Sequence, residues 1–157
     1  MTSEKIVTRE SIAGLLNKWH KNNFKVVFTN GCFDILHLGH VDYLEKASAL
    51  GDRMVIGINT DASVKKLKGP ERPINNEYAR ARVLAALEFV HAVILFGEDT
   101  PYELIDIIKP DILVKGNDYS PENIVGADIV LSNGGAVKTI PLVEGYSTTG
   151  IISKLKK

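Results

Sequence analysis

Cysteine is almost absent from this 157-residue chain, and charge of one sign is not in excess. Cys32 is the single cysteine, so no disulfide can form within the chain, which fits a reducing compartment. The 19 basic and 19 acidic residues cancel, leaving no overall field to attract nucleic acid or an anionic membrane. No apolar run reaches transmembrane length, and the first ten residues lack the apolar core of a signal peptide. We therefore expect a cytoplasmic protein that binds neither nucleic acid nor membrane.

The composition of the chain is typical of one globular domain. Apolar residues make up 45% of the chain and charged residues 24%, and the length suffices for a substantial core. We expect a single domain over residues 1–157. Within it, residues 1–23 read as a helical N-terminal extension, because apolar residues recur at helical spacing over 8–22 after a capping Thr8.

Short apolar segments alternate with helical ones along the rest of the chain. Strands are predicted at 25–29, 53–59, 92–96, 111–116 and 136–141, and helices at 41–50, 77–90, 101–109 and 148–157. The first of these helices is expected to end with Gly51 in the position after its C-cap. Continuous apolar strands are typical of a parallel sheet covered on both faces. The sequence therefore predicts an α/β fold, a Rossmann-like doubly wound parallel sheet of about five strands with helices on both faces.

Polar loops follow several of the predicted strands. They include FTNGCFDILHLGHVDYL (28–44), NTDAS (59–63), KGNDY (115–119) and EGYSTT (144–149). Open parallel sheets bind ligands outside the carboxyl ends of their strands, where such loops meet. We expect these loops to form one site.

Two histidines mark the first loop. His37 and His40 are three residues apart at the predicted start of a helix, so they can point to the same side. Gly31 allows the chain to turn, and Gly39 lets a ligand approach the helix start, whose free N–H groups suit phosphate. Zinc is disfavoured, because no third ligand lies at recognisable spacing. Phosphate binding is the favoured interpretation, and a pair of loop histidines without a function is the alternative.

The stretch GCFDILHLGH resembles the G-x-F-D-x-x-H-x-G-H motif of nucleotidyltransferases related to the cytidylyltransferases and pantetheine-phosphate adenylyltransferase. The later segments resemble the adenylyltransferases that act on D-glycero-D-manno-heptose 1-phosphate; these segments are LKGPERPI (67–74), EDTPYELIDIIKPDILVKGNDY (98–119), IVGADIVLSNGGAV (124–137) and EGYSTTGIISKL (144–155). In that family the unit is free-standing or is the C-terminal half of a bifunctional kinase–transferase. No kinase segment precedes it in this sequence, so we expect a separate kinase to supply the substrate.

The resemblance implies transfer of AMP from ATP to the sugar phosphate, with Mg²⁺, giving ADP-heptose and pyrophosphate. It also implies a homodimer as the common state. Asp34 is expected either to brace the loop or to help hold magnesium. Lys65 or Lys68 is expected to meet the phosphates from a lid, and Arg80, in preference to Arg82, to reach the triphosphate. The catalytic set implied in this way is His37, His40, Lys68 and Arg80.

Nucleotide binding is assigned to the loops around these residues. The set comprises Thr29, Asn30, Gly31, Cys32, Phe33, Asp34, Gly39, Lys65, Gly116, Asn117, Asp118, Ser147, Thr148 and Thr149. Backbone groups of 116–118 are expected at the adenine edge, and 147–149 are expected to cap the last helix and to bind the ribose or an anion. Cys32 is expected to pack and not to act as a nucleophile, because nothing near it is an obvious base.

Other functions share parts of this pattern. The same chemistry on another small phosphate, such as glycerol 3-phosphate, or with CTP, is the nearest alternative. A non-catalytic nucleotide-binding module is a second. A fragment of an aminoacyl-tRNA synthetase is disfavoured by the short chain and by its zero net charge.

Overall fold

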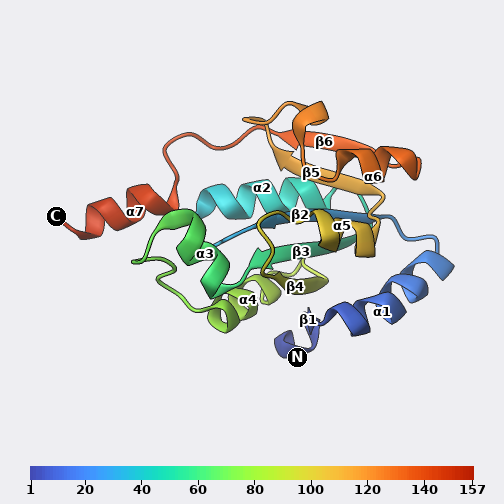
Figure 1. The fold of residues 1–157 in the computed structure, drawn as a ribbon, viewed down its shortest axis with the longest axis horizontal. Helices are drawn as coiled ribbons and strands as arrows, with labels where there is room; N and C mark the ends of the chain where they lie inside the picture. The colour runs from blue at the N-terminus through green and yellow to red at the C-terminus, as the bar shows by residue number, and fades with distance from the viewer.

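The computed structural model describes all of residues 1–157 and contains one six-stranded sheet (Figure 1). Its strands are β1 (Ile6–Val7), β2 (Val26–Gly31), β3 (Arg53–Asn59), β4 (Ala92–Phe96), β5 (Ile112–Gly116) and β6 (Ala136–Ile140). They lie in the order β1-β4-β3-β2-β5-β6, and every pair is parallel. The predicted doubly wound α/β fold is confirmed. The sixth strand is β1, which pairs with β4 and lay within the predicted helical extension.

Seven α-helices connect or flank the strands. They are α1 (Arg9–Lys21), α2 (Leu38–Ser48), α3 (Asp61–Lys68), α4 (Glu77–Ala85), α5 (Tyr102–Ile108), α6 (Ala127–Ser132) and α7 (Thr148–Leu155), with 3-10 turns η1 (Thr2–Lys5) and η2 (Pro121–Asn123). The predicted cap of α1 is confirmed, because the Thr8 hydroxyl accepts a hydrogen bond from the Ser11 N–H at 3.1 Å.

Several helix boundaries differ from the prediction. The lysine-rich α3 was missed because it buries only Ser63 and Val64 and so shows no apolar stripe. The short α6 was missed as well. The predicted helix over 77–90 ends at Ala85. The predicted role of Gly51 is wrong: α2 ends at Ser48, and a Cβ at Gly51 would lie 2.9 Å from the Lys25 carbonyl oxygen, so this glycine serves close packing.

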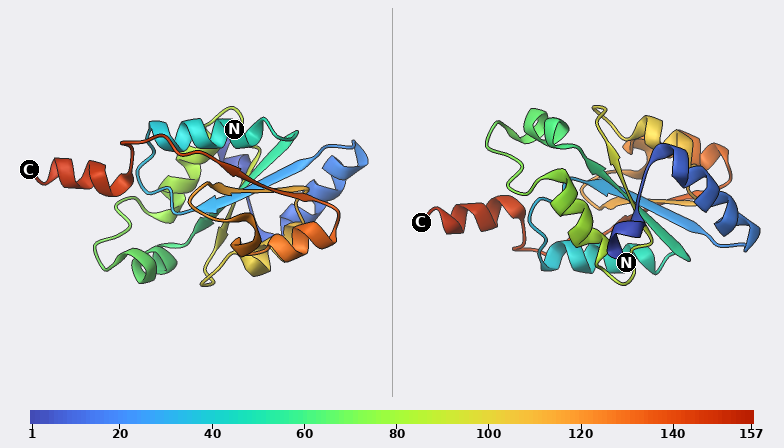
Figure 2. Two further views of the ribbon diagram at one scale, coloured as in Figure 1. Left: turned by 90° about the horizontal axis from the view of Figure 1, so that it is seen from above. Right: turned by 90° about the horizontal axis from the view of Figure 1, so that it is seen from below.

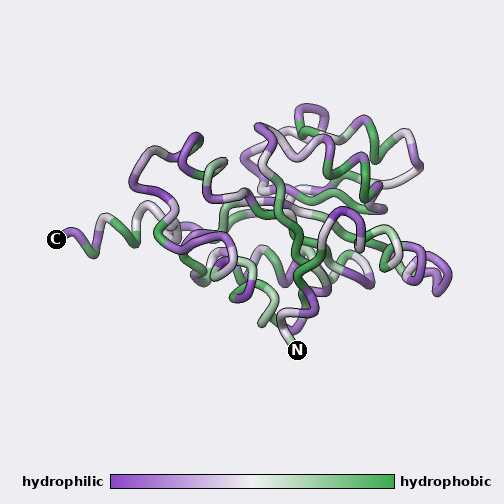
Figure 3. The backbone as a smooth tube through the Cα atoms, turned by 60° about the horizontal axis from the view of Figure 1, so that its bottom comes forward, coloured by the Kyte–Doolittle hydropathy of each residue, from purple (hydrophilic) through white to green (hydrophobic).

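The helices cover the sheet from both sides, as the two views in Figure 2 show. On one face α1, α5 and α6 bury a core that includes Phe28 and Leu113, and on the other α2 and α4 bury one that includes Val27 and Val114. The apolar strands form the centre of the chain trace, and polar residues gather in the loops (Figure 3). None of the helices has the length and apolar character needed to cross a bilayer.

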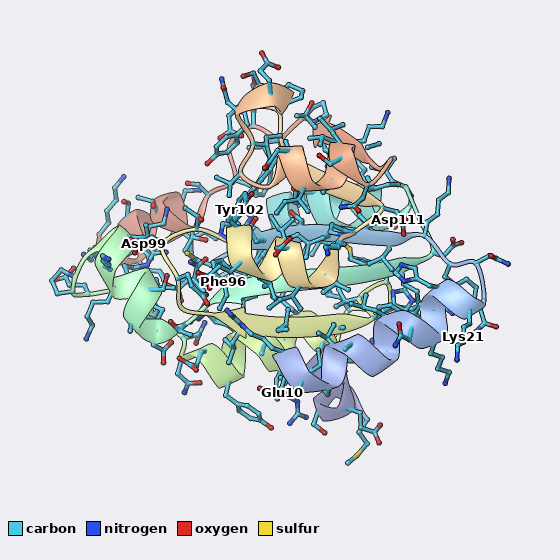
Figure 4. The ribbon with its side chains drawn as sticks, turned by 45° about the vertical axis from the view of Figure 1, so that its right-hand side comes forward. Glu10, Lys21, Phe96, Asp99, Tyr102 and Asp111 are labelled. Carbon is cyan, nitrogen blue, oxygen red and sulfur yellow. The ribbon has the colours of Figure 1, made fainter.

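The topology fixes where a site can form. Strand β2 lies between β3 and β5, and the strand order reverses there, so the loops after β2, β3 and β5 diverge around one crevice. Phe96 and Asp99 mark this carboxyl edge in Figure 4, and Lys21 and Asp111 mark the opposite edge. Helix α7 projects beyond the carboxyl edge with no buried residue (Figure 1).

Candidate active site

The two histidines meet at the start of α2. His37 is the N-cap residue and His40 lies in the first turn. Their rings stack with centroids 3.8 Å apart and planes inclined by 20°. The ring of Phe33 packs edge-on against His40 with centroids 5.1 Å apart. The expected shared orientation of the pair is confirmed, because the two rings stack at the start of α2, where the first N–H groups have no partner within the helix.

Burial disfavours the protonated form of both imidazoles. Burial, with a smaller effect from the proximity of His37, lowers the pKa of His40 to about 4, although a backbone hydrogen bond with Ile35 acts in the opposite direction. Burial also lowers the pKa of His37. The Nδ1 atoms of both rings are buried and have no hydrogen-bond partner. Buried polar atoms without partners are uncommon, and here they mark a place where a ligand can supply the hydrogen bonds.

The glycines of this loop serve packing more than turning. The residue of this loop with a left-handed backbone is Phe33, with φ of 49°, and Gly31 has no positive φ. A Cβ at Gly31 would lie 2.9 Å from the Phe33 ring. A Cβ at Gly39 would lie 2.9 Å from the His37 ring, so glycine there makes room for the histidine stack.

The start of α7 is fixed beside the histidines. Ser147 caps the helix by accepting a hydrogen bond from the Gly150 N–H at 2.9 Å, as predicted. Thr148 donates its hydroxyl to the Ile35 carbonyl oxygen at 3.4 Å. The Tyr146 ring lies roughly parallel to that of His37, with centroids 6.5 Å apart. Loops more than a hundred residues apart in sequence thus form one wall of the site.

Asp34 braces the loop that follows α3. Its buried carboxylate accepts hydrogen bonds from the N–H groups of Ile74 and Asn75 at 2.8–2.9 Å and from Arg72 Nε at 2.8 Å. Burial raises the pKa of Asp34, but the two backbone N–H groups and Arg72 outweigh it and hold the pKa below its ordinary value. Of the two predicted roles, these contacts support bracing.

Arg80 is buried, and its donors are engaged within the protein. Its Nε donates to the Asn75 carbonyl oxygen, one terminal nitrogen donates to those of Cys32 and Asn59, and the other binds Asp61 Oδ1, all at 2.8–2.9 Å. This differs from the expected reach to a triphosphate. The guanidinium instead ties the ends of β2 and β3 to the loops around α3.

Arg82 points elsewhere, as the helical spacing predicted. Its Nε donates to the Thr2 hydroxyl and a terminal nitrogen donates to the Tyr78 hydroxyl. Arg82 therefore connects α4 to the N-terminal segment, away from the histidines.

The remaining residues at the end of β2 differ in what they face. The Thr29 hydroxyl is buried and bonded to Tyr43 and to the Val114 carbonyl oxygen, so it joins strands instead of facing the crevice. Cys32 Sγ lies 3.6 Å from Asn59 Oδ1, and burial raises the pKa of this thiol. Asn30 Oδ1 is buried without a partner.

The lysines expected in a lid lie on the last turn of α3. Lys65 and Lys68 are exposed and make no ion pair, whereas Lys66 binds Asp99 at 2.7 Å. Lys68 and Thr149 both line a cleft of about 350 Å³ between the loop after α3 and α7. The structure thus brings the predicted lysine and the start of α7 to one opening.

The expected base-binding loop follows β5. The Asn117 N–H donates to the Ile140 carbonyl oxygen at 3.0 Å, and a Cβ at Gly116 would lie 2.8 Å from Asp118 Oδ1. This loop lies at the same sheet edge as the histidines. Lys115, just before it, was missed, although a lysine at the end of an apolar strand is itself a signal.

No resident metal site is built from side chains. The fold contains no group of three or more histidine, cysteine or acidic residues that could hold a metal ion. The carboxylate nearest the histidine loop, Asp34, is already saturated by protein donors. The arrangement is suited to binding phosphate groups by neutral hydrogen-bond donors, a helix start and nearby lysines.

Comparisons with known proteins agree with this geometry. Residues 28–153 match the cytidylyltransferase-like family model. The chain is 56% identical over 151 residues to the bifunctional protein HldE of Syntrophotalea carbinolica, and the match covers 96% of this chain and 31% of the relative. It is 55% identical over 153 residues to the same-named protein of Magnetococcus marinus, covering 98% and 31%. The chain therefore spans about a third of the length of these relatives.

Solved structures share the fold. The lipopolysaccharide core biosynthesis protein of Thermoplasma volcanium is 29% identical, with a TM-score of 0.61 over 79% of this chain and 99% of that one. The pantoate-beta-alanine ligase of Francisella tularensis, in complex with beta-gamma ATP and beta-alanine, has a TM-score of 0.63 at 16% identity, and the match covers 96% of this chain and 76% of that one. The match over most of the chain, with the histidine pair at the start of α2, places this protein in the cytidylyltransferase-like family of nucleotidyltransferases.

Proposed function

We propose that the protein transfers AMP from ATP to D-glycero-D-manno-heptose 1-phosphate, releasing pyrophosphate and forming ADP-heptose. The observation that carries the proposal is the stacked, neutral His37–His40 pair at the start of α2. The segment resemblance set out above favours the heptose acceptor, and the high identity to proteins named as bifunctional HldE supports it.

The reaction requires that the two substrates be positioned for attack and that the negative charge of the departing pyrophosphate be stabilised. A sugar phosphate is already an anionic nucleophile, so no general base is needed to activate it. One of its oxygens attacks the α-phosphorus, and the bond to the bridging oxygen of pyrophosphate breaks as that group leaves with the electron pair. Neutral His37 and His40 would donate N–H groups to phosphate oxygens, and the helix start would add N–H donors and partial positive charge.

The surrounding residues would complete nucleotide binding. Lys68, with Lys65 beside it, would meet the leaving phosphates from the cleft next to Thr149. Backbone groups of 116–118 would contact adenine, and the start of α7 would contact the ribose or a phosphate. Asp34 and Arg80 would hold these loops in place. Magnesium would enter bound to the nucleotide phosphates.

Two further expectations accompany the proposal. We propose a cytoplasmic location, because the reaction consumes ATP and Cys32 is the single, unpaired thiol. We also propose a homodimer, which the resemblance implies.

The test is pyrophosphate release with magnesium. ATP and CTP are each paired with both anomers of heptose 1-phosphate and with glycerol 3-phosphate. Release only with ATP and a heptose phosphate is expected. Pyrophosphate release with CTP or with glycerol 3-phosphate would indicate the same transfer reaction with a different nucleotide or acceptor. Nucleotide binding without release in any mixture would favour a non-catalytic nucleotide-binding module.

A further inference from the structure

The start of α2, which carries the two histidines, has no side-chain cap. His37 is its N-cap residue and makes no capping hydrogen bond through its ring. Leu38 in the first turn is 53% exposed, and the first buried residue of the helix is Tyr43. Tyr43 lies about one helical turn after His40. Because a helix is rigid over one turn, the contacts that hold Tyr43 also limit where His40 can lie.

The Tyr43 hydroxyl belongs to a buried chain of hydrogen bonds. It lies 2.8 Å from Thr29 Oγ1, and the Thr29 hydroxyl donates to the Val114 carbonyl oxygen at 2.9 Å. A threonine hydroxyl has one proton, which the Val114 carbonyl accepts, so Tyr43 is the donor to Thr29. Both side chains are buried, and bonds shielded from water hold their geometry closely. Helix α2 is therefore joined to β2 and β5 by directed bonds as well as by apolar packing.

This chain of bonds lies where β2 and β5 separate. The last registered pair of the two strands is Phe28 with Leu113. At the next residue of each strand, the Thr29 side chain bonds the Val114 carbonyl oxygen. Beyond this point β2 leads into the histidine loop, and β5 leads into residues 116–118. The chain of bonds thus connects the helix of the histidines to the strand that carries a second loop of the site.

The Tyr43 hydroxyl has no proton to exchange with a substrate. Burial raises the pKa of Tyr43 to about 12, although the hydrogen bond with Thr29 acts in the opposite direction, and the carboxylate of Asp118 adds to the rise. The hydroxyl stays protonated at neutral pH, and Thr29 accepts its hydrogen bond. Its contribution to a reaction is therefore one of position and not of acid or base chemistry.

We propose that Tyr43 and Thr29 are positioning residues for the transfer reaction, and that their hydroxyls fix His40 at the start of α2 relative to the loop that follows β5. This rests on the proposed function. Without the two hydroxyls, apolar packing still holds α2 on the sheet but allows its start to shift slightly. Such a shift lowers the rate, because donors that stabilise developing charge act only in a closely defined geometry.

The first test is a double-mutant cycle on kcat. Tyr43→Phe removes only the hydroxyl, and Tyr102→Phe is the matched control, because the Tyr102 hydroxyl donates to Asp128 at the surface. The contribution of one hydrogen bond limits the effect, so Tyr43→Phe is expected to lower kcat about threefold to tenfold, with the KM for ATP within about twofold. Tyr102→Phe is expected to stay near wild type. In a His40→Ala background, Tyr43→Phe is expected to lower kcat no further, because the residue that it positions is absent.

Variants of Thr29 test the other end of the link. Thr29→Ser keeps the hydroxyl and is expected to stay within about twofold of wild type. Thr29→Val keeps the shape, loses the hydroxyl and is expected to show at least the loss of kcat of Tyr43→Phe, with the KM for ATP little changed. If the Thr29 hydroxyl instead contacted the nucleotide, Thr29→Val would raise the KM for ATP and Tyr43→Phe would behave as wild type. That pair of results would overturn the proposal.

An NMR measurement separates failure of the positioning role from failure of the proposed reaction. The rings of Phe33 and His37 pack against His40, so the imidazole signals of His40 report small displacements of the ring. Tyr43→Phe is expected to shift these signals, with and without a non-hydrolysable ATP analogue, and Tyr102→Phe to leave them unchanged. If wild type releases no pyrophosphate with any acceptor but the shifts occur, the proposed reaction fails and the positioning of His40 stands. Unchanged signals in Tyr43→Phe, or the same loss of kcat with and without His40, would overturn the positioning role.

Discussion

A variant of Arg80 can distinguish two roles for this side chain, binding the triphosphate and holding the surrounding loops in place. In the structure its side chain is fully buried and donates four hydrogen bonds, three to carbonyl oxygens and one to Asp61. Arg80→Met fills a similar volume but leaves the carbonyl groups of Asn75, Cys32 and Asn59 without this donor. Each buried carbonyl oxygen left without a donor costs about 1–3 kcal/mol, whereas Asp61 is 40% exposed and its lost ion pair adds little, so we expect a loss of about 3–5 kcal/mol of unfolding free energy. For a chain of this size that corresponds to a fall in Tm of roughly 6–20 °C.

The assay is urea and thermal unfolding followed by circular dichroism, with nucleotide binding measured on the same samples. Arg82→Met is the matched control on the same helix, because Arg82 bonds only hydroxyl groups near the surface, and it is expected to lose less than about 1 kcal/mol. The positioning role would be refuted if Arg80→Met kept wild-type stability and lost ATP binding. That result would mean that the guanidinium leaves its internal partners to reach the triphosphate.

Four further expectations concern the histidine loop. His40→Ala should lower kcat far more than it lowers the affinity for ATP. An equal loss of kcat and of ATP affinity would contradict a contact that is stronger in the transition state than in the ground state. The neutral His40 stabilises the fold fully above pH about 6.5, and this contribution should fade as the pH drops toward its pKa of about 4, which histidine NMR titration checks. The carboxylate of Asp34 has a lowered pKa, so its contribution to stability should be complete at neutral pH and fade as the pH falls from about 4 through that lowered pKa. The stability of Asp34→Asn, measured by urea unfolding at acid pH, should therefore depend less on pH than that of wild type. Cys32→Ser should retain pyrophosphate release within a few-fold, whereas complete loss would make the thiol a participant.

Local sequence patterns determined the elements with strong apolar periodicity. The apolar runs of β2 to β6 and the amphipathic α1 were predictable because burial in a parallel sheet or against it requires those patterns. The cap at Ser147 and the pairing of His37 with His40 also follow from spacing along the chain, since a helix fixes neighbours three residues apart. Lysine-rich α3 carried no such pattern, and its sequence was interpreted only as a lid.

Only the tertiary structure decided which charged groups are available to a ligand. Asp34 and Arg80 were both candidate ligand contacts in the sequence. In the structure they are hydrogen-bonded to groups from segments about 20 to 50 residues away, which occupy their donors and acceptors. The Oδ1 atom of Asn30 is buried at the end of β2 without a hydrogen-bond partner, which no local pattern of the sequence indicates. The periodicity of the sequence shows which face of an element a residue occupies. Whether a buried polar group finds a hydrogen-bond partner depends on which strands pair and where the loops lie, and neither is encoded in a short stretch of sequence.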